Sequence, residues 1–441
     1  MISLSFKRLK NKLFHKGRIQ SSLLALLLLT AVQGYIYAGI FSLERDGACI
    51  YGDEGQRERT KQITERREQI KESRQSASMP LILLPSHGIE ETLPEFPKYL
   101  IKRYDTVRIA FIGDVMQHGV QIRSALAESG HSGNDGGYDY SAAFKYTSPL
   151  LKKADLAVAN MEFPLGTPPY SGYPRFSAPA QIATEAAKSG IGLFQIANNH
   201  LMDKGKAGIE NTLRIYDSIG TPYTGAWKNG KEESESNPKI LAVKGIRIGF
   251  VNFTYGTNGL PVPQPYIIGS MDSIEIKKVI ERGFGRGAEI MIALPHWGEE
   301  YMLYPSEEQK KWNRMLIRNG VKIIIGTHPH TIQTSEHTDS TITYYSLGNY
   351  ISNQSSPDYT QLELMVTVTI VRDNFTGRVT PAKSDFEYLW CFKKGELERD
   401  YTVVPVNNFL NGTTDSLLAR PGQYRRMQKT YEYIKGLKLL H

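Results

Sequence analysis

Cysteine is almost absent from this chain, whose 441 residues include only Cys49 and Cys391. Two cysteines cannot form the framework of several disulfides that stabilises small secreted domains, so the fold must rest on a hydrophobic core. One bridge and two free thiols both remain open from the sequence. Apolar residues make up 40% and charged residues 22% of the chain. These ordinary values exclude a disordered or low-complexity chain.

The body of the chain also lacks an excess of basic residues, although the formal net charge is +8. The first 20 residues hold six Lys or Arg and no acid, and the last 22 hold six Lys or Arg and one Glu. Subtracting +6 and +5 from +8 leaves about −3 for residues 21–419. A body with that charge has no broad basic surface, so we expect no nucleic-acid partner.

Charge is missing altogether between Ile19 and Phe41. A helix of that length, at ~1.5 Å per residue, spans the ~30 Å apolar core of a bilayer. We therefore predict a cytoplasmic basic segment over 1–18 and a transmembrane anchor over 19–41. The basic residues place the bulk of the chain outside the cytoplasm, as a single-pass protein of the cell membrane. A cleaved signal peptide is the alternative, and the length of the uncharged stretch favours a retained anchor.

Residues 53–78 are mostly charged or Gln and Ser, and several prolines follow them. We interpret residues 42–106 as a charged spacer and an irregular lead into the first strand. A coiled-coil dimer segment is disfavoured because Ile63 and Ile70 alone are too little apolar surface to bury.

Residues 107–355 alternate between short apolar runs and helix-like segments, which predicts a layered α/β domain of sheets and helices. Strands are expected at Val107–Ile112, Leu156–Ala159, Leu193–Ala197, Ile246–Phe253, Ile290–Leu294, Val321–Ile325 and Thr341–Tyr345; helices are expected at Gln181–Lys188, Ile209–Ser218, Ile274–Arg282 and Ser306–Arg318. Short strands at Leu362–Val371 and Glu387–Phe392, followed by a basic tail, predict a small C-terminal β extension over 356–441.

Five of the apolar runs stop on residues that bind metals. The runs and their terminal residues are VRIAFIGD with Asp114, DLAVANME with Glu162, LFQIANNH with Asn199 and His200, EIMIALPH with His296, and VKIIIGTHPH with His328 and His330. Loops at the carboxyl ends of strands are where open α/β sheets gather their ligands. We therefore expect these residues to converge on one rim.

The residue types in this set suit one or two divalent metal ions. Carboxylate, imidazole and amide oxygen ligands fit Zn, Mn or Fe, and a pair of ions needs a bridging carboxylate. A lone Asp after a strand is usually a turn residue, and a lone His is more often structural than a ligand. Four of ten histidines in strand-end loops make a joint pattern that chance explains poorly.

At these residues the chain resembles the poly-γ-glutamate capsule biosynthesis proteins of the CapA type, a branch of the calcineurin-like metallophosphoesterase fold. The matching motifs are GDVM at 113–116, NME at 160–162, NNHLMDKGKAG at 198–208, HWGEEY at 296–301, GTHPH at 326–330 and YSLGNY at 345–350. They cover roughly residues 107–355, in the order that the family has them.

The resemblance implies a role for each ligand. One metal is expected on Asp114, Glu162 and His330, and the other on Glu162, Asn199, His296 and His328, with Glu162 bridging. His200 is implied as the catalytic residue, a proton donor to a leaving group. Asp203 is expected to cap or brace the helix after Asn199.

The chain departs from the wider phosphoesterase pattern in its first motif, because Met116 stands where the Asp-x-His signature has its histidine. A thioether is a poor ligand for a hard ion. The first metal position is therefore short of a ligand unless His118 or water fills it. Glu300 and Tyr301 of the HWGEEY motif could line the pocket, whereas a structural role suits Trp297 at least as well.

Two classes of function fit this pattern. In the first, the protein acts in the synthesis or export of a capsule polymer, poly-γ-glutamate or a similar acidic chain, together with other capsule proteins. The alternative is a metal-dependent envelope phosphoesterase or other hydrolase that is not tied to poly-γ-glutamate. In the first class, the pocket could also bind metal or polymer without catalysing a reaction. The sequence therefore does not decide whether the protein is an enzyme.

Overall fold

The structure is a computed structural model that describes residues 104–130, 137–397, 399–410 and 421–440. The expected anchor at 19–41, the spacer and Cys49 lie outside the described residues. Among the residues that are described, no helix is long and apolar enough to cross a membrane.

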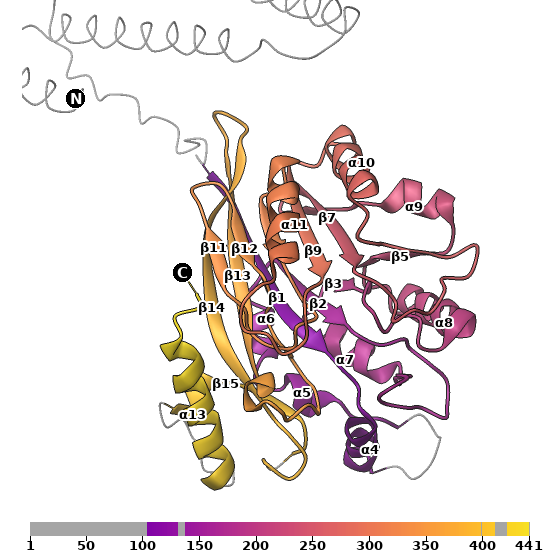
Figure 1. Ribbon diagram of the computed structural model, residues 1–441, viewed down its shortest axis with the longest axis vertical. Coiled ribbons are helices and arrows are strands. Elements are labelled where there is room, and N and C mark those ends of the chain that lie inside the picture. The colour runs from indigo at the N-terminus through magenta and orange to yellow at the C-terminus, as the bar shows by residue number, and fades with distance from the viewer. Residues whose placement is uncertain (1–103, 131–136, 398, 411–420, 441) are drawn as a thin grey trace, which may run out of the picture. The chain divides into compact units, whose positions relative to one another are not determined.

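The first of two large sheets holds seven strands in the order β15-β14-β13-β1-β2-β3-β4 (Figure 1). Strands β1 to β4 run parallel, and β13 is antiparallel to β1. Their bounds are β1 Tyr104–Val115, β2 Leu156–Met161, β3 Leu193–Gln195, β4 Tyr223–Thr224, β13 Leu362–Asp373, β14 Val379–Phe392 and β15 Thr402–Pro405.

The second large sheet holds six strands in the order β11-β12-β10-β9-β7-β6. The four central strands are parallel, and the two edge strands are antiparallel to their neighbours. Their bounds are β6 Lys239–Val243, β7 Ile246–Thr254, β9 Ile290–His296, β10 Ile323–Ile325, β11 Ser335–His337 and β12 Ile342–Tyr344; a separate pair is formed by β5 Ala226–Trp227 and β8 Ile267–Ile268.

The two sheets pack face to face, and helices cover their outer faces. Alternate residues of β1, such as Ile109 and Phe111, join Ile248 of β7 and Ile292 of β9 in the core between the sheets. The other face of β1, represented by Ala110, packs under α4 Gly119–Glu128, α5 Ser141–Phe144, α6 Ser148–Leu151, α7 Gln181–Lys188 and α8 Gly205–Ile219. The period of two along each strand thus gives both faces of the first sheet an apolar core.

The outer face of the second sheet packs under α10 Ser273–Gly285 and α11 Glu307–Arg318. Both helices begin at side-chain caps: Asp272 accepts hydrogen bonds from Ile274 and Glu275, and Ser306 forms a capping box with Gln309. The remaining helices are α9 Gly230–Ser236, α12 Val406–Leu410, α13 Pro421–Gly436 and the short 3-10 helix η1 Asp358–Gln361.

The mixed α/β fold of sheets and helices is confirmed, and the C-terminal strands correct one expectation. They are not a small extension after residue 356: β13 pairs with β1 from Tyr104↔Asp373 to Phe111↔Val366, inside the first sheet. Strands β13 and β14 form the longest antiparallel ladder in that sheet. The physical reason is that β13 bonds to the edge of β1 on the side away from β2, so that neither side of β1 is left unpaired.

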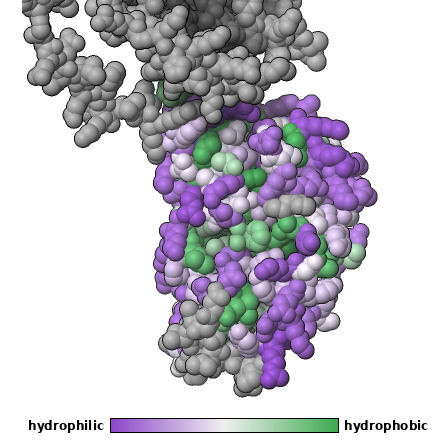
Figure 2. Space-filling view, turned by 90° about the vertical axis from the view of Figure 1, so that its left-hand side faces the viewer, coloured by the Kyte–Doolittle hydropathy of each residue, from purple (hydrophilic) through white to green (hydrophobic). Residues whose placement is uncertain are grey.

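The face that carries β14 and α13 has apolar residues interspersed with hydrophilic ones (Figure 2). A groove of about 580 Å³ lies there, lined by Phe386, Tyr388, Asn407, Tyr431, Lys435, Lys438, Leu439 and Leu440. It shares no residue with the set predicted to bind metal.

Candidate metal centre

The carboxyl ends of parallel strands from both sheets meet at one rim, and the predicted ligands lie there. Asp114 belongs to the end of β1, Glu162 follows β2, and His296 ends β9. Asn199 and His200 follow β3, and His328 and His330 follow β10. All seven side chains are buried. The local reason is the same in each case, because an apolar strand ends and the polar residue after it turns toward the rim.

Close approach of two backbones places Asp114. The pairing of β1 with β2 shifts register between Ile112 and Asp114, which turns the Asp114 side chain. The Asp114 amide donates to the Gly348 carbonyl at 2.9 Å. A Cβ atom on Gly113 would lie 2.0 Å from that same oxygen. Glycine at 113 is therefore required for the YSLGNY turn to reach the strand.

The first group of ligand atoms comes from Asp114, Glu162 and His330, all within 4.8 Å of one another. The Asp114 Oδ2 lies 3.1 Å from His330 Nδ1, and Glu162 Oε1 lies 3.8 Å from His330 Nε2. This is the set that the resemblance assigns to one metal.

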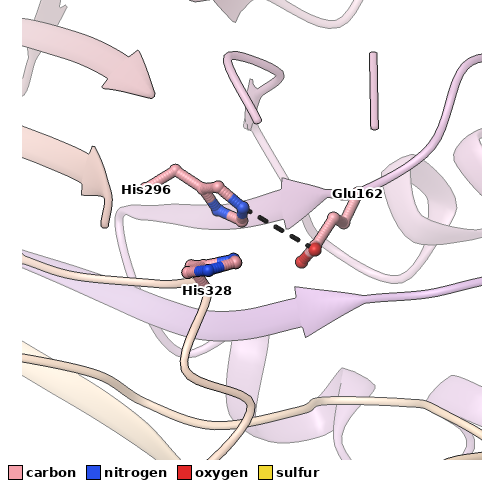
Figure 3. A group of neighbouring side chains, drawn as sticks. All are labelled: Glu162, His296 and His328. Atoms are coloured by element: carbon pink, nitrogen blue, oxygen red, sulfur yellow. Dashed lines mark ion pairs between the residues drawn. The ribbon is translucent and has the colours of Figure 1, made fainter. Parts of the chain in front are cut away.

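The second group comes from Glu162, His296 and His328, again within 4.8 Å (Figure 3). Glu162 Oε1 lies 3.7 Å from His296 Nε2, and the same nitrogen lies 2.9 Å from Asn199 Oδ1. Atoms that share one ion through bonds of ~2.1 Å lie roughly 3 to 3.5 Å apart. The 2.9 and 3.7 Å separations in the second group lie on either side of that range, and Glu162 belongs to both groups.

The electrostatics of the site favour an added positive charge. Burial, then the charge of Asp114, raises the pKa of Glu162 well above its usual value. Burial, then neighbouring imidazoles, lowers the pKa of His296 and of His328. Glu162 Oε1 and His328 Nδ1 are buried and have no hydrogen-bond partner among the described residues. Buried acceptors without donors are costly, and a divalent cation is the group that this donor set fits.

Several side chains that the sequence did not single out hold the ligands in place. Asn160 donates to Asp114 Oδ1 at 2.8 Å and lies 3.3 Å from Glu162 Oε2. His296 Nδ1 lies 3.0 Å from the Thr327 hydroxyl, which leaves Nε2 for the site. Such outer partners set the tautomer and the orientation of a ligand. The sequence feature that could have identified Asn160 is its position at the end of a predicted strand, two residues before Glu162.

Backbone conformation and the YSLGNY turn also hold the GTHPH loop. His328 and His330 have φ angles of 99° and 59°, a region that L-residues rarely occupy. The Asn349 amide donates to the His330 carbonyl at 3.4 Å and to Thr360 at 3.1 Å. Asn349 therefore supports a proposed ligand, His330, through the backbone. Trp297 has a different role: it is fully buried and donates a hydrogen bond to the Tyr345 carbonyl at 2.9 Å, which is a structural contact.

His200 lies beside the ligands in contacts that fix its ring. Its Nδ1 is 2.8 Å from Asp203 Oδ2, and its ring packs edge-on against Phe176 at 4.6 Å. The same Asp203 oxygen accepts from the Phe176 amide at 2.8 Å. Helix α8 begins only at Gly205, so Asp203 does not cap it. Asp203 instead braces His200, and Nε2 is the ring nitrogen left to exchange a proton.

Neither residue 116 nor residue 118 completes the first group. Met116 is buried, and its sulfur lies 3.6 Å from the Ser352 hydroxyl. His118 Nδ1 lies 3.0 Å from Gln121 Oε1 and 3.3 Å from the Asn353 amide nitrogen, so one of these two groups is its hydrogen-bond partner. Burial lowers the pKa of His118 to about 4. His118 is in none of the ligand groups found among the described residues.

Two tyrosines flank the histidines. The Tyr255 ring lies 4.6 Å from the His328 ring, and the Tyr301 ring lies 6.2 Å from the His330 ring. Burial, then carboxylate charges, raises the pKa of each hydroxyl to about 12. Both therefore stay protonated near neutral pH and can donate hydrogen bonds to an anionic group. Tyr255 carried no motif signal in the sequence.

Comparison with known proteins shows the family. The profile of the bacterial capsule synthesis protein family PGA_cap matches residues 108–354, more than half of the chain. The chain belongs to this family, and the resemblance carried by the motifs is confirmed.

Two curated relatives are similar over much of the chain. The capsule biosynthesis protein CapA of Bacillus anthracis is 26% identical over 261 residues, which cover 57% of this chain and 61% of that protein. The PGA biosynthesis protein CapA of Bacillus subtilis (strain 168) is 27% identical over 301 residues, which cover 65% of this chain and 74% of that protein.

Solved structures match more weakly. A phosphatase from Mycoplasma pneumoniae is 12% identical with a TM-score of 0.40, and the match covers 64% of this chain and 93% of that one. The NAD nucleotidase of Haemophilus influenzae is 13% identical with a TM-score of 0.38, and the match covers 77% of this chain and 57% of that one. Scores this low support no conclusion about the site.

Proposed function

We propose that this family member is anchored in the cell membrane with residues 42–441 outside the cytoplasm, and that it acts on an acidic capsule polymer through a pocket that holds two divalent metal ions. The observation that carries the metal proposal is the shared carboxylate of Glu162, whose buried Oε1 faces His296 and His330 at 3.7 and 3.8 Å. The anchor proposal rests on the uncharged stretch from Ile19 to Phe41 after six basic residues.

Six residues would hold the ions: Asp114, Glu162, Asn199, His296, His328 and His330. When bound, such ions supply an activated water and neutralise charge on a phosphoryl or acyl group. The remaining chemistry belongs to the chain. His200 offers a proton to a leaving group through Nε2, because Asp203 holds Nδ1. The rings of Tyr255 and Tyr301 lie near His328 and His330, and in this proposal their hydroxyls donate hydrogen bonds to an anionic substrate.

The capsule role rests on the family, and the names of the relatives support a polymer of the poly-γ-glutamate type. Partners in the membrane, such as other capsule synthesis or export proteins, are part of the same proposal. A metal-dependent phosphoesterase that serves another envelope substrate uses the same pocket, so the substrate has to be tested directly.

The test uses the full-length protein purified in detergent. Bound metal is measured by elemental analysis, and turnover is measured on phosphoesters and on γ-glutamyl polymers with Zn, Mn and Fe. Two bound ions and cleavage or transfer of the polymer are expected. Turnover of phosphoesters alone would support the phosphoesterase. Two bound ions without any turnover would indicate an assembly component, and protein that binds no metal would contradict the proposal.

A further inference from the structure

The first group of candidate ligands has three members, and one further acid of the chain, Glu300, lies close to one of them, His330. Asp114, Glu162 and His330 are three ligands, whereas the second group has four with Asn199 included. Structural zinc sites have four protein ligands, whereas catalytic sites have three and keep a position for water, so the first group has room for one more ligand. Met116 offers a thioether that faces Ser352, and His118 faces Gln121 and Asn353.

Glu300 belongs to a third group of close ligand atoms, with His328 and His330. Its carboxylate oxygen and one nitrogen of each histidine lie within 4.8 Å of one another. Glu300 is exposed, so it approaches the histidines from the solvent side, whereas Asp114 and Glu162 approach from the buried side. An exposed acid alone means little, and the position of Glu300 matters because its loop is fixed.

Backbone hydrogen bonds join the loop of Glu300 to the loop of the two histidines. The Tyr301 amide donates to the Pro329 carbonyl at 2.8 Å, between His328 and His330. The Trp297 amide donates to the Thr327 carbonyl at 3.1 Å. Tyr301 has a φ angle of 66°, which turns the chain directly after Glu300. These bonds therefore keep the backbone at Glu300 beside the loop that carries the two histidines.

We propose that Glu300 is a metal ligand that takes the place of the imidazole missing at position 116. The inference rests on the proposed metal pocket. With Glu300 as the ligand, a charged carboxylate oxygen replaces the neutral imidazole nitrogen of the Asp-x-His signature. The ligand then comes from the solvent side instead of the buried strand end. Asp114, Glu162 and Glu300 then place three negative charges around two divalent ions.

The test compares Glu300→Gln with Glu299→Gln in the full-length protein. Both residues are exposed and adjacent, and Glu299 is in none of the ligand groups found among the described residues. Metal content and affinity are measured by elemental analysis and by competition with a chelator, using Mn and Zn. We expect Glu300→Gln to lose one of two ions or to bind it at least about 10-fold more weakly, since even outer partners of a ligand change affinity by 10- to 100-fold. Glu299→Gln should match the wild type.

A second variant separates ligation from a general effect of charge. Met116→His restores an imidazole at the first motif, so Met116→His with Glu300→Gln should regain the lost ion, and the absorption spectrum of the cobalt-loaded protein should return toward that of the wild type. Two ions bound with unchanged affinity by Glu300→Gln would overturn the inference and leave the metal pocket standing. A wild type without metal would overturn both.

Discussion

His200 Nδ1 and Asp203 Oδ2 lie 2.8 Å apart in a buried pair, with Phe176 packed against the ring and its amide bonded to the same carboxylate oxygen. The pair fixes the ring without using any of the six proposed metal ligands. The proposed proton transfer and the proposed metal binding thus use different residues, and substitutions can test them separately.

Replacement of His200 by alanine should leave metal content nearly unchanged. Any hydrolysis should slow by roughly 10²- to 10⁴-fold, the usual contribution of a general acid. Asp203→Asn should slow it less, because the ring keeps a hydrogen-bond partner. Elemental analysis and rates on the same samples check both points. Loss of metal in His200→Ala would show that His200 is a ligand or braces one. If the wild type turns over nothing, His200→Ala should still support capsule formation in cells.

Replacement of Glu162 by glutamine should lower bound metal more than any other single change at the rim, because both ligand groups share this carboxylate. Met116→Ala is the control: it also alters a buried residue of the first motif but removes no proposed ligand. We expect Met116→Ala to keep wild-type metal content. Equal metal in wild type and Glu162→Gln would rule out the bridging role.

Gly113→Ala should destabilise the protein by about 2 kcal/mol or more, since the added Cβ would overlap the Gly348 carbonyl oxygen and force the turn away from β1. Bound metal should fall with it, because Asp114 follows directly. Gly285→Ala is the matched control, at a helix end where a Cβ meets nothing within 4 Å. The free energies of unfolding of the two variants and of the wild type are measured in urea and compared. A Gly113→Ala protein as stable as the control would contradict the close approach.

His118 should make the protein sensitive to mild acid. Its folded pKa of about 4 lies below the usual histidine value of 6.5, so the folded state resists taking up a proton on this ring. The stability that this contributes is complete above pH 6.5 and is lost as the pH falls toward 4, by about 3 kcal/mol in total. The difference in unfolding free energy between wild type and His118→Gln should therefore shrink from pH 7.5 to pH 4.5. A difference that stays constant with pH would argue against the buried neutral ring.

The membrane topology is tested on cells. Protease added to intact cells, or to cells whose outer barrier has been opened, should digest the chain after Phe41, because the six basic residues before Ile19 stay inside. A cytoplasmic protein serves as the control for lysis. Full protection of the carboxyl-terminal part would refute the orientation, and a mature chain that begins after residue 41 would establish the cleaved signal peptide instead.

The sequence by itself determined the strands and the residues that follow them. The apolar runs that end at Asp114, Glu162 and His296 are local signals, since strand formation and the turn after it depend on a few neighbouring residues. Helix α7 lies at Gln181–Lys188 as expected, and α11 starts one residue after the predicted Ser306 because that residue is its cap. The metal hypothesis needed only the order and type of these residues.

Only the tertiary structure decided which strands share a sheet and which ligands share a group. The pairing of β13 with β1 joins residues more than 250 positions apart, and no local pattern encodes such a partner. The same holds for Glu300, whose distance from His328 and His330 depends on two loops joined by backbone hydrogen bonds. Sequence patterns report the local preference of each segment, whereas the packing of two sheets brings distant segments to one rim and so decides what surrounds Glu162.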